Sequence, residues 1–215
     1  MDDTIVVNKA ELRGTVCCRP AFSHESRGEK FLTFPVEIQR LSGAIDTINV
    51  LAREWQLAEL DIGDETKLHV CGELRSFNNK SGKGSKLVLS VLARELELDY
   101  GEEKNTIELI GTICKKPILR ATPMGREICD LMLAVNRRYG RSDYLPCITW
   151  GLRARESSEW DVGDTVHLIG RTQSRKYIKN IAGNSIEKTA FEVSVIEISL
   201  TVSPQPDKHL ERECL

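Results

Sequence analysis

The sequence lacks the features that mark several large classes of protein. Its 215 residues include seven cysteines without a Cys-x-x-Cys pair and four scattered histidines, so it indicates neither a disulfide framework nor a metal site such as zinc. No apolar run approaches the roughly 20 residues of a membrane span, and the start at Met1, Asp2 and Asp3 lacks the regions of a signal peptide. We therefore expect a cytoplasmic protein with reduced thiols and no cofactor.

What the sequence does contain is an internal repeat. The stretch Asn8–Cys17 returns as Asn105–Cys114 at an offset of 97 residues, and Asp61–Asp64 returns as Asp161–Asp164 at an offset of 100. Solenoid repeats have periods of roughly 20 to 50 residues, so a spacing this long indicates a duplicated compact domain.

The repeat predicts two domains of unlike charge. We expect a first domain over 1–99, a connector over 100–104, a second domain over 105–201 and a flexible tail over 202–215. The formal net charge of -2 averages these parts, because residues 105–201 hold 14 Lys and Arg against 11 Asp and Glu, whereas residues 8–99 hold 13 against 14. The basic excess therefore lies in the second domain.

Catalytic motifs are not found. His69 and His167 occupy equivalent places in the two repeats, and neither has a Ser or Cys partner at a recognised spacing. Gly82 and Gly84 are not followed by the Gly-Lys-Ser/Thr of a phosphate loop. We expect structural histidines and a protein that is not an enzyme.

Short β-branched and apolar runs punctuated by Gly and Asp predict five strands in the second repeat. Leu152–Trp160 has helical composition and lies between the third and fourth of these runs, and Leu51–Leu60 holds the same place in the first repeat. This order predicts an all-β protein with two tandem OB-fold, five-stranded Greek-key barrels, each with one short helix between the third and fourth strands.

Five motifs of the second repeat occur in the order and spacing of a known family. They are Gly111–Pro117, Leu119–Gly125, Leu131–Tyr139, Ile148–Trp150 and Gly170–Tyr177. The repeat thus resembles the bacterial single-stranded DNA-binding protein family. The resemblance implies one OB domain per copy, and it implies that the rings matching its base-stacking positions are Tyr139, Tyr144, Trp150 and Tyr177. Since family members bring four OB domains together, it also implies a homodimer.

The residues themselves support the same interpretation. Single-strand binders combine aromatic rings for the bases with a basic groove for the backbone. Side chains alternate across a strand, so Arg171, Gln173, Arg175 and Tyr177 share a face that is too polar for a barrel interior. Beside the four rings, the predicted phosphate contacts are Arg137, Arg138, Arg171, Arg175, Lys176, Lys115, Lys116 and Arg120.

The first repeat has lost most of this pattern. We align Leu41 with Tyr139, Ala44 with Tyr144, Val50 with Trp150 and Glu73 with Arg171, and we expect Trp55 and Trp160 to be packing residues. For this half we predict either a mainly structural role or an auxiliary contact with DNA through Arg40, Arg53, Arg75, Phe77, Lys80, Lys83 and Lys86.

Together these patterns predict sequence-independent binding of single-stranded DNA in replication, recombination or repair. Two alternatives stay open, an OB-fold protein-interaction module of a replication or mobile-element complex and an RNA-binding protein. Glu211–Leu215 lacks the acidic, Phe-ending tip with which family members recruit replication and repair proteins, so we do not expect recruitment by that route.

The asymmetry between the repeats gives a first prediction. Phe77→Ala should weaken binding of single-stranded DNA less than Tyr177→Ala does, because the first repeat has few other rings to support a stacked base. Titration of both variants with an oligothymidine checks this, and equal losses would reject the asymmetry.

Overall fold

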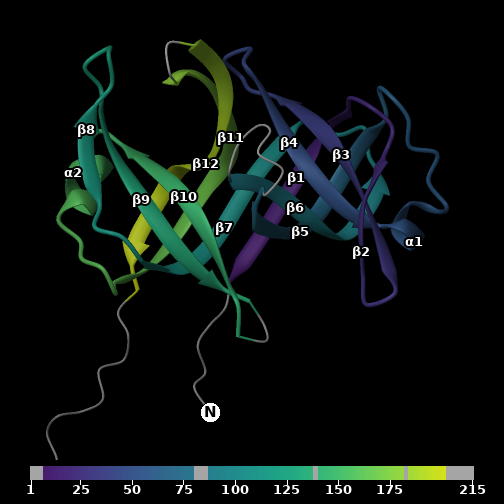
Figure 1. The fold of residues 1–215 in the computed structure, drawn as a ribbon, viewed down its shortest axis with the longest axis horizontal. Coiled ribbons are helices and arrows are strands. Elements are labelled where there is room, and N and C mark those ends of the chain that lie inside the picture. Colours follow the sequence, from purple (N-terminus) through teal and green to yellow (C-terminus); the bar gives the residue numbers. More distant parts are fainter. Residues whose placement is uncertain (1–6, 80–86, 138–139, 182–183, 202–215) are drawn as a thin grey trace, which may run out of the picture.

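The computed structural model describes residues 7–79, 87–137, 140–181 and 184–201, and within these it describes only the backbone of residues 175–189 (Figure 1). The first half contains β1 (Asn8–Val16), β2 (Ala21–Ser26), β3 (Glu29–Gln39), β4 (Ile45–Arg53), α1 (Glu54–Leu57), β5 (Lys67–Asn78) and β6 (Leu87–Leu98). The second half contains β7 (Lys104–Ile113), β8 (Ile118–Ala121), β9 (Glu127–Asn136), β10 (Ser142–Trp150), α2 (Leu152–Ser158), β11 (Thr165–Ile181) and β12 (Asn184–Leu200).

Each half is an OB barrel of five strands. Pairing in the order β3-β4-β6-β5-β1 is closed by β1 with β3, and the second half repeats this with β9, β10, β12, β11 and β7. The predicted all-β, tandem OB fold is therefore confirmed. Neither helix in the described part of the chain is long and apolar enough to cross a membrane.

Two details of the predicted order were wrong. A sixth strand, β2 or β8, pairs along the outer side of β3 or β9, so in chain order each helix follows the fourth strand and not the third. These strands were missed because every residue in them is exposed and shows no apolar alternation. The first helix has only four residues, because Leu51 to Arg53 continue β4 in its pairing with β3.

The two barrels share one continuous sheet. β1 and β7 pair antiparallel from Asn8 opposite Leu109 to Arg13 opposite Lys104, in the middle of the molecule (Figure 1). Asn8 and Asn105 make equivalent bonds beside this joint. The Asn8 side chain donates to the Leu74 carbonyl at 2.9 Å and accepts from its N–H at 2.8 Å, and Asn105 does the same with Thr172 at 2.7 and 3.0 Å. The halves are thus related by an approximate two-fold axis through the joint.

Charged side chains also bridge the joint. Glu11 accepts from His69 at 3.1 Å and pairs with Lys104 at 2.7 Å. Glu108 accepts from His167 at 3.0 Å and pairs with Lys9 at 3.2 Å. In each case a histidine of the same half and a lysine of the other half share one carboxylate. The hydrogen bond from Lys104 is the main cause that lowers the pKa of Glu11, and the bond from His167 is the main cause for Glu108.

Alternating burial fills both barrels. In β1, Ala10, Leu12, Gly14 and Val16 are buried while the residues between them are partly exposed, which is the period of two expected for a strand with one face on a core. The last two barrel strands of each half are interrupted by a register shift at a glycine, Gly72 in β5 and Gly170 in β11. A Cβ built on Gly170 would lie 2.6 Å from the Ser194 carbonyl oxygen, closer than side chains come to backbone.

Gly170→Ala should therefore destabilise the second barrel by about 1–3 kcal/mol, the usual cost of overpacking. Thermal unfolding measures the loss. Gly63→Ala is the matched control, since no atom lies within 4 Å of a Cβ at Gly63. Equal melting temperatures for the two variants would contradict the prediction.

Candidate nucleic-acid interface

Two aromatic side chains stand on the outer face of β10. Tyr144 is 55% exposed and Trp150 is 37% exposed, whereas Leu145 and Cys147 between them point into the core. The Trp150 indole N–H donates to the Ser194 hydroxyl at 3.2 Å, which ties the ring to the neighbouring strand β12. β10 is the third strand of its barrel, and the strand 2–3 face is the one with which OB folds bind oligonucleotides. Both rings are therefore placed where bases can stack.

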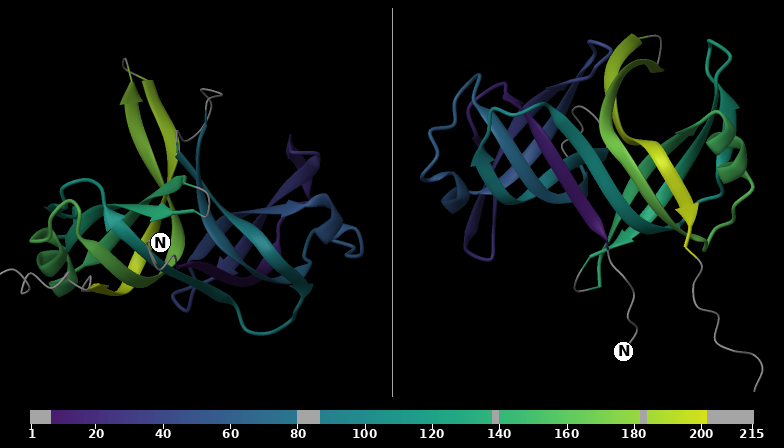
Figure 2. Two further views of the ribbon diagram at one scale, coloured as in Figure 1. Left: turned by 90° about the horizontal axis from the view of Figure 1, so that it is seen from below. Right: turned by 180° about the vertical axis from the view of Figure 1, so that it is seen from behind.

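The hairpin of β11 and β12 borders this face. It links the last two barrel strands, the position of a second oligonucleotide-binding loop in OB folds. Figure 2 shows it projecting beyond both barrels. The backbone of β11 places Arg175, Lys176 and Tyr177 opposite residues 188–190 of β12, but their side chains lie outside the described part, as do Arg138 and Tyr139 entirely. Lys80, Lys83 and Lys86 of the first half also fall outside it.

The burial of residues 171–174 in β11 differs from the prediction. Gln173 was expected on a solvent or ligand face with Arg171, but its side chain is buried and its amide donates to Glu192 at 2.8 Å. This part of β11 lies beside β4 of the first half, which covers it (Figure 1). The contact between halves could not be read from the alternation of a single strand.

Arg137 and Arg75 meet in a buried ion cluster between the halves. The carboxylate of Asp143 is fully buried and accepts from Arg137 Nε at 2.7 Å, from Arg75 Nη1 at 2.9 Å and from the Ser76 N–H at 2.7 Å. Burial alone raises the pKa of Asp143, but the bonds from Arg137, Ser76 and Arg75 outweigh it and hold the pKa below its ordinary value. Arg75 is only 8% exposed, so its predicted place on a DNA surface is wrong.

Most of the other predicted cations are paired. Lys116 lies 2.8 Å from Asp161, Arg53 lies 3.0 Å from Glu29, and Arg120 donates to Asp130 at 2.9 Å. Arg40 is bound to the buried Asp46 at 2.6 Å, and Lys115 is exposed. A DNA phosphate would have to displace the carboxylate from each of these cations or bind the cation together with it. Either case reduces the electrostatic gain from the contact.

The strand register corrects the alignment of the first half. Val50 in β4 and Cys147 in β10 are both buried and both pair with a valine of the last barrel strand, Val91 or Val193. Val50 is therefore the equivalent of Cys147 and not of Trp150. Continuing this register places Arg53 at the Trp150 position and Thr47 at the Tyr144 position, while Leu41 and Ala44 correspond to sequence positions 138 and 141. The alignment was off by three residues at Ala44 and Val50, next to Leu51–Arg53, which were assigned to a helix, and by one residue at Leu41. The alignment of Glu73 with Arg171 agrees with the register.

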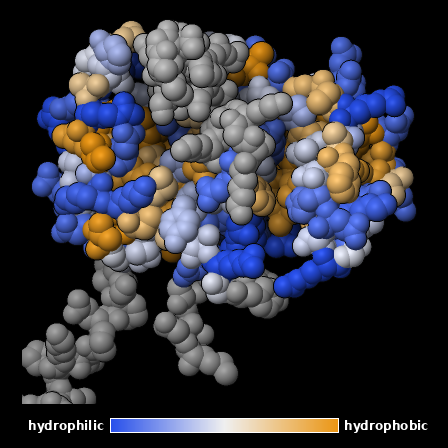
Figure 3. All heavy atoms as spheres, viewed as in Figure 1, coloured by the Kyte–Doolittle hydropathy of each residue, from blue (hydrophilic) through white to orange (hydrophobic). Residues whose placement is uncertain are grey.

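The two tryptophans that were expected to be packing residues, one in each half, differ in exposure. Trp160 is 7% exposed, as expected for a packing residue, but Trp55 is 65% exposed on α1. His24 of β2 stacks on Phe31 of β3 with centroids 4.9 Å apart, and the Arg53 guanidinium lies 5.5 Å from the same ring. The stacked His24 belongs to the exposed strand β2, which was missed because its residues show no apolar alternation. On the face shown in Figure 3, apolar side chains form separate patches among charged ones over both barrels.

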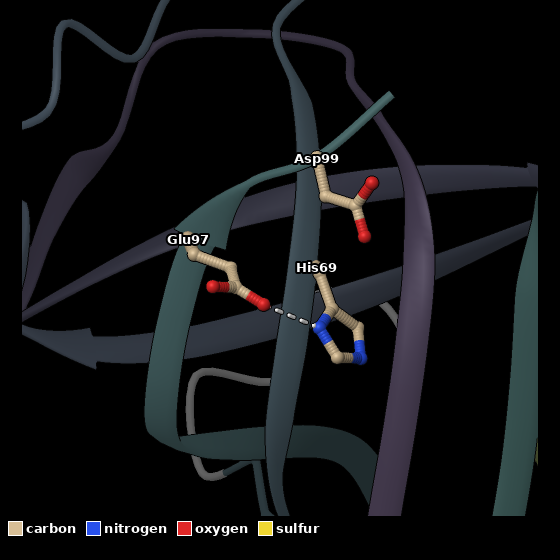
Figure 4. A group of neighbouring side chains, drawn as sticks. All are labelled: His69, Glu97 and Asp99. Carbon is tan, nitrogen blue, oxygen red and sulfur yellow. Dashed lines mark hydrogen bonds and ion pairs between the residues drawn. The ribbon is translucent and has the colours of Figure 1, made fainter. Parts of the chain in front are cut away.

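His69, Glu97 and Asp99 form a group whose ligand atoms lie within 4.8 Å of one another (Figure 4). His69 Nδ1 bonds to Glu97 at 2.9 Å, and Asp99 accepts from Arg13 and from the Gly101 N–H, each at 2.7 Å. All three residues are thus engaged by protein groups. In the second half, Ser199 stands opposite His167 where Glu97 stands opposite His69. The geometry is that of an ion-pair ladder.

The closed barrels and the exposed rings of β10 define a tandem OB-fold protein with a surface suited to oligonucleotides. Residues 104–201, which form the second half of the chain, match the model of the "Single-strand binding protein family".

Individual relatives agree with this match. Single-stranded DNA-binding protein A of Bacillus subtilis (strain 168) is 29% identical over 100 residues, which cover 43% of this chain and 58% of that protein. Single-stranded DNA-binding protein 2 of Listeria innocua is 29% identical over 114 residues, 50% of this chain and 68% of that protein. The wild-type single-stranded DNA binding protein from Thermus aquaticus matches in structure with a TM-score of 0.76 at 21% identity, covering 97% of this chain and 99% of that chain. This last likeness shows that the tandem fold is shared.

The buried cluster between the halves gives a stability prediction. Asp143→Asn should cost about 3–5 kcal/mol, because it leaves the buried Arg75 without its anionic partner across the joint. Denaturant unfolding measures the change. Asp130→Asn removes the partner of Arg120 from an exposed pair and should cost about 1 kcal/mol or less. A small, equal effect of both substitutions would contradict a structural role for the cluster.

Proposed function

We propose that the chain binds single-stranded DNA with little sequence preference and protects or organises exposed strands in replication, recombination or repair. The observation that carries the proposal is the pair of exposed rings, Tyr144 and Trp150, on the oligonucleotide-binding strand of a barrel that matches this family. The relatives described above, all named as single-stranded DNA-binding proteins, support it.

The chemistry of the site suits binding of single-stranded DNA without sequence preference. Each stacked base contributes about 1–3 kcal/mol, and every base has a π-face to offer. The indole N–H of Trp150 is already bonded to Ser194, so the ring offers its face and no donor that would select a base edge. We assign further contacts to Tyr139, Tyr177, Arg138, Arg175 and Lys176, with Lys115, Lys116 and Arg120 at the rim. Binding is the whole mechanism, and no catalytic step is assigned to the chain.

Two associated chains would bring four OB domains together in one dimer. We propose a homodimer, supported by the two barrels in each chain. Light scattering on the purified protein tests it directly. A mass of twice 24.2 kDa is expected, and a monomeric mass would remove this part of the proposal.

Titration with an unstructured oligothymidine tests the binding itself. We expect quenching of tryptophan fluorescence, and a loss of about 5- to 150-fold in affinity for Tyr144→Ala or Trp150→Ala, which corresponds to one stacked base. Tyr100→Ala is the control, because Tyr100 is exposed in the connector away from β10.

Failure to bind at low salt would overturn the proposal. Unchanged affinity in both ring variants would overturn the stacking site. Tighter binding of an RNA oligomer of the same sequence would move the protein to RNA, since only a contact to the 2′-hydroxyl separates the two ligands.

A further inference from the structure

The approximate two-fold axis creates the same junction between the halves twice, once at β10 beside β5 and once at β4 beside β11. Each junction holds a buried aspartate bound by an arginine of its own half, Asp143 with Arg137 and Asp46 with Arg40. The two junctions differ in what the opposite half supplies. This difference assigns different roles to them.

At the first junction the opposite half completes the cluster. Arg75 Nη1 reaches Asp143 at 2.9 Å, and Glu73 on the same strand pairs with Arg75 and, at 3.0 Å, with Arg94. Each guanidinium group of this cluster therefore has a carboxylate partner, because Arg137 and Arg75 share Asp143 while Arg75 and Arg94 share Glu73.

At the second junction the pattern is inverted. The register shifts at Gly72 and Gly170 make Gln173 the equivalent of Arg75, and Arg171 the equivalent of Glu73. Gln173 turns away to Glu192, and Arg171 brings a second cation toward the Arg40 and Asp46 pair. The Nε of Arg171 is buried and has no hydrogen-bond partner in the described part of the chain. Burial and the charge of Arg40 lower the pKa of Arg171, against the opposing effect of Asp46. One carboxylate thus faces two guanidinium groups.

The unpaired cation is next to the stacking site. Arg171 stands directly opposite Ser194 in the pairing of β11 with β12, and Ser194 accepts the bond from Trp150. Directly opposite residues of a strand pair share a face, and Ser194 is also opposite Ile148, which lies two residues before Trp150 on the same face of β10. Trp150, Ser194 and Arg171 therefore form a diagonal row across three neighbouring strands. With strands about 4.8 Å apart and a rise of about 3.3 Å per residue along β10, the row spans roughly 12 Å. A base on Trp150 would have its neighbouring backbone within reach of Arg171.

Resting on the function proposed above, we propose that Arg171 and Arg40, one from each half, bind a backbone phosphate of the same DNA strand, so that the strand passes from the second barrel to the first at the β4 and β11 junction. Phosphate oxygens accept paired hydrogen bonds from a guanidinium group, which would satisfy the open donor and neutralise the surplus charge. In the cluster around Asp143 every guanidinium group is bonded to a carboxylate, so the crossing is one-sided.

The salt dependence of oligothymidine binding tests this in Arg171→Gln. Losing one phosphate contact on a single strand lowers the slope of log K against log salt by about 0.7. The variant should therefore bind about fivefold more weakly at 0.1 M salt and match the wild type near 1 M. Its melting temperature should not fall, because the substitution removes an unpaired, desolvated charge. Arg171→Lys should restore most of the slope.

Arg13→Gln is the matched control, with the same loss of charge from a residue that is paired with Asp99 at 2.7 Å on the connector side. Its slope should equal that of the wild type. An unchanged slope in Arg171→Gln, while the wild type binds, would overturn the crossing site alone. Absence of wild-type binding at low salt would overturn both this inference and the proposed function.

Discussion

Antiparallel pairing of β1 with β7 is the interaction on which the rest of the structure depends. A strand that leaves its barrel with open N–H and C=O groups would otherwise be an edge ready to pair with another chain. Here each such edge satisfies the other from Asn8 to Arg13, and the duplicated barrels become one sheet. The side chains of Asn8 and Asn105 add hydrogen bonds to Leu74 in β5 and Thr172 in β11. The carboxylates of Glu11 and Glu108 form ion pairs with lysines of the opposite half. The pairing also fixes the approximate two-fold axis, and so it decides which surfaces of the two halves face each other.

Duplication supplies a scaffold in which one copy can change while the other keeps its role. At the equivalent positions of the third barrel strand, the second half has Tyr144 and Trp150, whereas the first has Thr47 and Arg53. At the junctions, Gln173 and Arg171 of the second half are the structural equivalents of Arg75 and Glu73 of the first. The aromatic loss lies on the third barrel strand, β4 against β10, and the reversed charges lie on the fourth, β5 against β11. The first half therefore differs from the second in what it can offer a strand, although both barrels have the same core pattern.

Much of the fold was predictable because it shows in repeats and alternating apolar residues of the sequence. The repeat at an offset of 97 residues predicted two barrels, and the alternation in β10 predicted that Tyr144 and Trp150 would be exposed together. Strand β2 could not be found in this way, because its side chains are all exposed. The burial of Arg75 against Asp143 joins residues 68 positions apart in different halves, so no window of sequence contains it. Local periodicity reveals which side of a strand is apolar, but it does not reveal which outer faces another domain will cover.

The balance of forces at the candidate interface follows from these pairings. A chain with a formal net charge of -2 has no general attraction for DNA, and most of the described cations near the site are already bound to carboxylates. Exchanging a carboxylate for a phosphate returns little free energy, because one ion pair replaces another. Stacking carries no such cost, since Tyr144 and Trp150 offer exposed ring surface whatever the salt concentration. Affinity at this surface should thus depend chiefly on the rings, and the electrostatic part should be concentrated where a guanidinium group lacks a matched carboxylate, at Arg171 beside Arg40.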